Sequence, residues 1–118
     1  MSYPFAYGDE TLWEAGHHSG LLYASLARGA ADMLGIPSGL TASPEGGCQV
    51  SPPVFQEFVE RLYQLFSSTS NEVLLGLAHG VLTTSLVLLN RAGGTVELRP
   101  QDEAALGKEV AALARSMA

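Results

Sequence analysis

The stretch from Val73 to Leu89, VLLGLAHGVLTTSLVLL, is the most apolar run in the chain and constrains its fold more than any other feature. At the helical spacing of about 100° per residue, its apolar side chains fill an arc of roughly 220°. The remaining stripe holds Glu72, Gly76, His79, Thr83 and Asn90. A surface helix usually shows an apolar arc of only about 100° or somewhat more. We therefore expect a central helix over about 71–91 that is covered on two or three sides.

Signals at both ends of this run support a helix. Asn71 can cap its N-terminus, Glu72 and Arg91 suit the charges of its first and last turns, and Gly93 can stop it. A membrane span is the alternative interpretation. The run is slightly short of the roughly 20 residues that a span needs, and a lone span needs no polar stripe. We favour a buried helix in a protein without a membrane segment.

Three other segments have helical periodicity. Residues 19–34 follow a capping Ser19 and end at Gly35, and a second helix starts at Pro52, after Ser51. A last helix opens at Pro100. The second helix has apolar residues at helical spacing, namely Phe55, Phe58, Val59, Leu62, Leu65 and Phe66. We predict a mainly α fold: one domain over 1–118, a four-helix bundle-like arrangement around the helix at 71–91.

In the predicted helix over residues 19–34, polar and large apolar side chains lie on opposite faces and small residues lie between them. Ser25, Arg28 and Asp32 share one face, and Leu22, Leu26 and Met33 lie opposite. Many alanines and a glycine occur between them. Small residues let two helix axes approach closely, and we expect the central helix to be the partner.

Two short segments alternate apolar and other residues as strands do. Residues 3–7 contain Tyr3, Phe5 and Tyr7, and residues 95–99 also alternate, so the two could pair in a ribbon. Between them, residues 35–51 contain four glycines and two prolines. We interpret this stretch as a long loop that is either functional or mobile.

The charge of the chain excludes some functions. It has six basic residues against twelve acidic ones and a net charge of −6, so it lacks the basic cluster that nucleic acid or an anionic membrane requires. Residues 1–60 hold seven of the acids and only one base, Arg28. A single cysteine excludes an internal disulfide. Without a recognisable signal peptide, an acidic cytoplasmic protein is expected.

Few residues are candidates for chemistry. His79 and Thr83, with Glu72 nearby on the polar stripe, could line a small-molecule pocket in which His79 is a general base or an anchor. The same His79 could instead be a core residue. Trp13, which has acids on both sides, could contact a cation. Cys48 could be a nucleophile, but no basic residue is near it in the sequence.

His17 and His18, with the acids Asp9, Glu10 and Glu14, are the best candidates for a metal site. Adjacent histidines cannot share a helix face, and no HxxxH or ExxH spacing occurs. We therefore expect no metal and no cofactor, and we place both histidines in an exposed loop.

Four segments resemble a known family, namely Gly8–Trp13, Gly35–Gly39, Cys48–Pro52 and Leu88–Gly93. They are similar to small uncharacterised proteins of streptomycetes and related actinobacteria that are catalogued only as a domain of unknown function. The resemblance spans about residues 3–93 and implies a bacterial origin. It carries over no catalytic residue.

The helix at 71–91 is more apolar than one small bundle can cover. This predicts a small non-enzymatic interaction or accessory protein that forms a homodimer. The alternative is a small-molecule-binding protein, or a compact biosynthetic enzyme, with its pocket at His79 and Thr83. A third possibility is a partner protein of a specialised secretion system, although the WxG turn of one such class is absent, since Trp13 precedes Glu14-Ala15.

Overall fold

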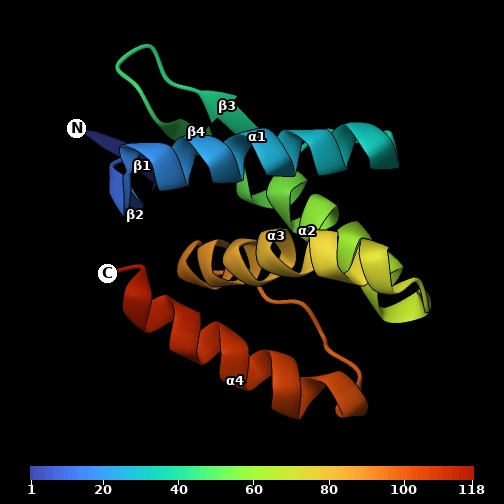
Figure 1. Ribbon diagram of the computed structural model, residues 1–118. Helices are drawn as coiled ribbons and strands as arrows, with labels where there is room; N and C mark the ends of the chain where they lie inside the picture. Colours follow the sequence, from blue (N-terminus) through green and yellow to red (C-terminus); the bar gives the residue numbers. More distant parts are fainter.

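The computed structural model describes residues 1–118 and contains four helices and a four-stranded mixed sheet (Figure 1). The elements in chain order are β1 (Ser2–Tyr7), β2 (Glu10–Gly16), α1 (His17–Leu34), β3 (Leu40–Ala42), β4 (Cys48–Val50), α2 (Pro52–Ser68), α3 (Glu72–Arg91) and α4 (Pro100–Ser116). The predicted all-α, four-helix bundle-like fold is therefore wrong, because the fold is α+β. The four predicted helices are present, but three strands lie in segments that we did not interpret as strands.

The sheet has the strand order β2-β1-β4-β3. β1 runs antiparallel to β2 and parallel to β4, and Phe5 lies opposite both Trp13 and Cys48. The supposed long loop at 35–51 contains the β3–β4 hairpin, which turns through Gly46 and Gly47 at positive φ. The extended N-terminal segment is thus a central strand of a sheet.

Residues 95–99 form no strand, so the proposed ribbon with residues 3–7 is wrong. The segment is held by α2: Gln56 Nε2 donates to the carbonyl of Thr95 at 2.6 Å, and the Tyr63 hydroxyl accepts from Arg99 N at 2.8 Å. Val96 and Leu98 are half-buried while their neighbours are exposed. The alternation therefore reflects which side chains of an irregular segment pack against the core.

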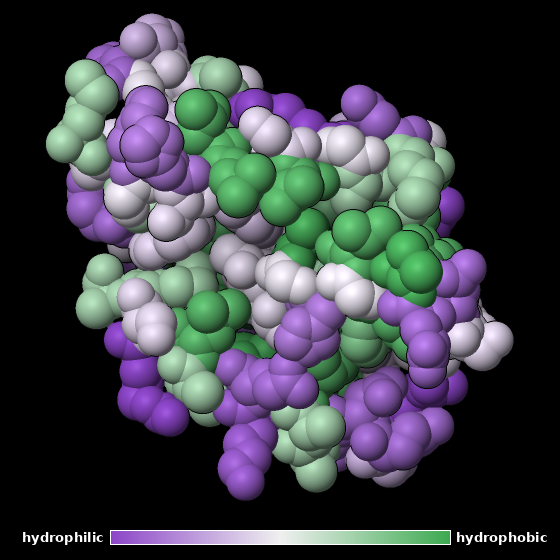
Figure 2. All heavy atoms as spheres, in the orientation of Figure 1, coloured by the Kyte–Doolittle hydropathy of each residue, from purple (hydrophilic) through white to green (hydrophobic).

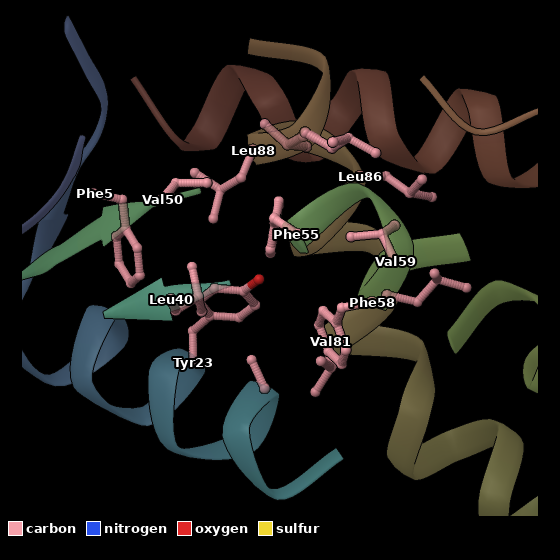
Figure 3. Packing of buried hydrophobic residues seen from close by; sticks show 14 of the residues in the cluster. Phe5, Tyr23, Leu40, Val50, Phe55, Phe58, Val59, Val81, Leu86 and Leu88 are labelled. Atoms are coloured by element: carbon pink, nitrogen blue, oxygen red, sulfur yellow. The ribbon is translucent and has the colours of Figure 1, made fainter. Parts of the chain in front are cut away.

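Helix α1 lies against the sheet at very short distance. A Cβ on Gly20 would meet Cβ of Tyr3 at 2.7 Å, so only glycine fits this crossing. The buried side of α1 consequently consists of small residues around one large one, namely Gly20, Tyr23, Ala24, Ala27 and Ala31. The Tyr23 hydroxyl and Ser85 Oγ, both buried, are 2.6 Å apart, and this hydrogen bond joins α1 to α3. Figure 3 shows Phe5, Tyr23 and Phe55 reaching the same interior from β1, α1 and α2.

Helix α3 occupies the middle of the helical layer, between α1 and α4 (Figure 1). Asn71 Oδ1 caps it by accepting from the backbone N–H groups of Val73 and Leu74, as predicted. By length and composition alone this helix could cross a membrane, but half of its apolar window is buried inside the domain. The chain forms a compact globular domain in which the C-terminal half of α3 belongs to the core.

Arg91 fastens the end of α3 to two other segments. Its Nη1 donates to the carbonyls of Leu12 and Met117 at 2.8 and 2.7 Å, and its Nη2 donates to the carbonyl of Ala114 at 3.0 Å. A guanidinium suits this place because the carbonyls at a helix C-terminus lack intrahelical partners. The residue holds β2 and the last turn of α4 in place.

Candidate interaction surface

Six large apolar side chains of the helices are exposed, and all of them belong to α1 or to the N-terminal half of α3. They are Leu21, Leu22, Leu26, Met33, Val73 and Leu77. Leu77 is 73% exposed and Leu22 is 61% exposed, whereas the core contains many leucines with almost no exposure. Single exposed apolar residues are common on soluble proteins, but a gathered set marks an interaction site.

The position of α1 explains its exposed leucines. Because α1 buries its alanines in the domain and packs on the sheet at Gly20, the opposite side faces outward. Leu22, Leu26, Gly29 and Met33 occupy that side at the spacing i, i+4, i+7 and i+11. The larger apolar residues of this helix are thus left on the surface.

The N-terminal half of α3 continues this surface. Val73, Gly76, Leu77 and Gly80 are all exposed and lie on one side of the helix. Together with Leu22, Leu26, Gly29 and Met33 they form what we call the α1/α3 face. Figure 2 shows hydrophobic side chains gathered over both helices, with paler residues between them.

The α1/α3 face is hollowed between the two helices. One hollow of about 390 Å³ has Leu22 and Leu26 on one side and Gly76 and Gly80 on the other. A second, of about 340 Å³, lies between Met33 and Leu77. Both are open to solvent, and no charged residue lines either one. The face therefore has projecting leucines and uncharged hollows side by side.

The structure places the predicted pocket residues His79 and Thr83 beside α4, next to the α1/α3 face. His79 Nε2 forms a short contact with the carboxylate of Glu109 on α4. Thr83 is buried, and its hydroxyl donates to the carbonyl of His79 within its own helix at 3.0 Å. His79, Thr83 and Glu109 line an open hollow with only two apolar residues, and Glu72 is exposed and not part of it. No sequence pattern indicated Glu109, which lies 30 residues from His79.

Trp13 packs on the sheet. Its ring stacks on Phe5, with the centroids 5.3 Å apart and the planes 14° apart, and it meets the edge of Tyr23. His17 and His18 are the first residues of α1 and do not lie in a loop. The structure assembles no group of three or more His, Cys, Asp or Glu side chains around them that could hold a metal ion.

Cys48 has a basic neighbour that the sequence did not reveal. Arg28, on α1, donates from Nη2 to the Cys48 sulfur at 3.5 Å. The Tyr3 hydroxyl lies 3.5 Å from the same sulfur. The hydrogen bond to Cys48 and burial raise the pKa of Tyr3. The thiol is 1% exposed, however, so a substrate cannot reach it in this conformation. The cluster joins α1 to β1 and β4.

A model described as a family of unknown function (DUF6086) matches residues 1–118, and the chain belongs to this family. This confirms the resemblance to a domain of unknown function that the four sequence segments indicated. No curated protein and no solved structure matches the chain.

Proposed function

We propose that this protein is a small non-enzymatic interaction protein that forms a homodimer through the α1/α3 face. One observation carries the proposal: five of the six exposed large apolar side chains of the helices gather on one uncharged face. Removing such side chains from water is the main favourable term in protein association. The buried, unpaired Cys48 fits a reducing compartment, and we place the protein in the cytoplasm.

A second copy of the chain suits this face better than a charged partner does. In a two-fold dimer the same patch meets itself, so one surface must supply both projections and hollows. The α1/α3 face has both, in Leu26 and Leu77 and in the space beside Gly76 and Gly80. The chain has a net charge of −6, yet none of the eight residues of this face is ionisable, so two copies can meet there without burying a charge.

The dimensions of the face set the expected strength of association. The α1 stripe, from Leu22 to Met33, is about 17 Å long, the α3 stripe, from Val73 to Gly80, is about 11 Å long, and two adjacent helices are roughly 20 Å wide. An area of this size is at the low end of specific interfaces, where complexes are weak or transient. We therefore expect a dissociation constant on the order of micromolar.

Light scattering after size-exclusion chromatography tests this proposal. At tens of micromolar, the wild-type protein should approach twice the 12.4 kDa mass of the chain, and dilution should lower the mass. Leu26→Glu and Leu77→Glu should each give monomers, because they would bury a charge in the interface. Ala105→Glu is the matched control, since Ala105 is exposed on α4 outside the face. A wild-type protein that stays monomeric at 100 µM contradicts the proposal.

The alternative function, a small-molecule pocket at His79 and Thr83, has less support. Ligand pockets are mostly apolar and enclosed, whereas the hollow there is open and includes Glu109 and Ser116. We prefer the interaction protein for this reason.

A further inference from the structure

We infer that the α3 helices of two subunits cross at Gly76 and Gly80, with their backbones in close contact. The inference rests on the proposed homodimer and adds the point at which the two copies meet. The argument starts from these two glycines in the interior of a helix, where glycine is less stable than alanine.

Several other glycines are required by close contacts within the chain. Added Cβ atoms at Gly20 and Gly39 would clash with Tyr3 and with the backbone of Phe55, at 2.7 and 2.5 Å. Gly76 and Gly80 have no such neighbour: an added Cβ would find nothing within 4 Å, and neither residue has a positive φ. Nothing within one chain requires glycine at these positions.

Close packing of a helix from a second subunit would explain glycine at both positions. Residues four apart lie on the same side of a helix, so Gly76 and Gly80 form one flat strip beside Leu77. Two helices that present glycines at this spacing can pack with their axes unusually close. Gly107 on α4 is equally open but has no glycine partner and lies outside the α1/α3 face.

The surroundings of the strip favour a second α3 over another occupant. Leu77 is 73% exposed next to the glycines, and the hollow between Leu26 and Gly80 can receive the same leucine from the partner subunit. Between Val73 and Asn90 the one ionisable residue of α3 is His79, and it contacts Glu109 on α4. Glu72 lies one turn before Gly76, so a crossing centred on Gly76 and Gly80 brings uncharged groups together and leaves Glu72 at its rim.

Gly76→Ala and Gly80→Ala test the crossing because they affect folding and association in opposite directions. Each added methyl group fits the single chain, so the melting temperature of the dilute monomer should rise by about 2–4 °C per substitution. The same methyl groups would separate the two helices. The double variant should therefore weaken the dimer by at least tenfold in sedimentation equilibrium.

Gly107→Ala is the matched control, since it should raise the melting temperature without changing association. A wild-type dimer that the double variant leaves unchanged would overturn the crossing, while the proposed homodimer would stand. A wild-type monomer at 100 µM would overturn both. Flotation of the wild-type protein with neutral phosphatidylcholine vesicles, together with a monomer in solution, would make a lipid surface the occupant of the face and would also overturn the crossing.

Discussion

The two halves of α3 have a similar sequence character and opposite surroundings. In the C-terminal half, Val81 to Arg91, most side chains are buried, and Leu82, Leu88 and Leu89 have no exposure. In the N-terminal half, Glu72 to Gly80, only Ala78 is buried, and Val73 and Leu77 are more than 70% exposed. One apolar run thus serves as core along half its length and as surface along the other half.

The difference comes from what the rest of the chain can cover. The C-terminal half lies between α2, α4 and the end of β2, and Arg91 and the Tyr23–Ser85 hydrogen bond hold these elements together. Beside the N-terminal half, the leucines of α1 point outward because its alanines occupy the buried side of the helix. The hydropathy of a helix indicates that its side chains will be shielded from water. It does not indicate whether the same chain or a partner shields them.

Leucine-to-alanine substitutions in the two halves should give the largest contrast. Leu88→Ala should lower the free energy of unfolding by about 3 kcal/mol, because it leaves a cavity in the core. Leu77→Ala should change the free energy of unfolding of the dilute monomer by less than about 0.5 kcal/mol, because the Leu77 side chain is exposed. Urea unfolding at about 0.1 µM, well below the expected dissociation constant, measures both. Equal losses would mean that the two halves are equally packed.

Arg91→Met should have the next largest effect, since it cuts the ties of the buried half to β2 and α4. We expect a loss of about 2 kcal/mol in urea unfolding, because three carbonyls lose a charged donor. Arg61→Met is the control, since Arg61 is exposed on α2 and makes no hydrogen bond or ion pair. If both variants lost the same stability, Arg91 would not have the fastening role described above.

A smaller effect should appear at high pH. Burial raises the pKa of Tyr23 above its usual value near 10, so the folded state holds this proton more tightly than the unfolded state. The protonated Tyr23 therefore contributes its full stabilisation of the folded state below pH 10. Above pH 10 the free energy of unfolding falls by about 1.4 kcal/mol per pH unit. Tyr23→Phe should remove this contribution, so that the free energy of unfolding falls less steeply with pH, by about 1.4 kcal/mol per pH unit. Ser85→Ala, which keeps the tyrosine, should retain the steep loss in urea unfolding between pH 9 and 11.

The helices could be predicted because each has local signals. Asn71, Gly35 and the prolines at 52 and 100 mark ends that the structure confirms within a few residues. The sheet could not be predicted in the same way. β3 and β4 have three residues each, in a glycine-rich stretch, and the parallel pairing of β4 with β1 joins residues more than 40 positions apart.

The candidate surface was only partly visible in the sequence. The excess of apolar residues in the run from Val73 to Leu89 predicted that something outside one bundle would cover it. Which residues remained exposed depended on the close crossing at Gly20, which no local pattern reveals. The contacts of His79 with Glu109 and of Cys48 with Arg28 were also missed, because they join separate elements.

Methyl NMR spectra recorded over a dilution series test the central claim most directly. If the N-terminal half of α3 is an interface and the C-terminal half is core, the methyl signals of Leu26 and Leu77 should shift between about 1 and 200 µM, because a dissociation constant on the order of micromolar makes the protein change from partly to almost fully dimeric over this range. Those of Leu82 and Leu88 should stay in place. Shifts absent from Leu26 and Leu77 over this range, or equally large at Leu88, would contradict the assignment of the two halves to different roles.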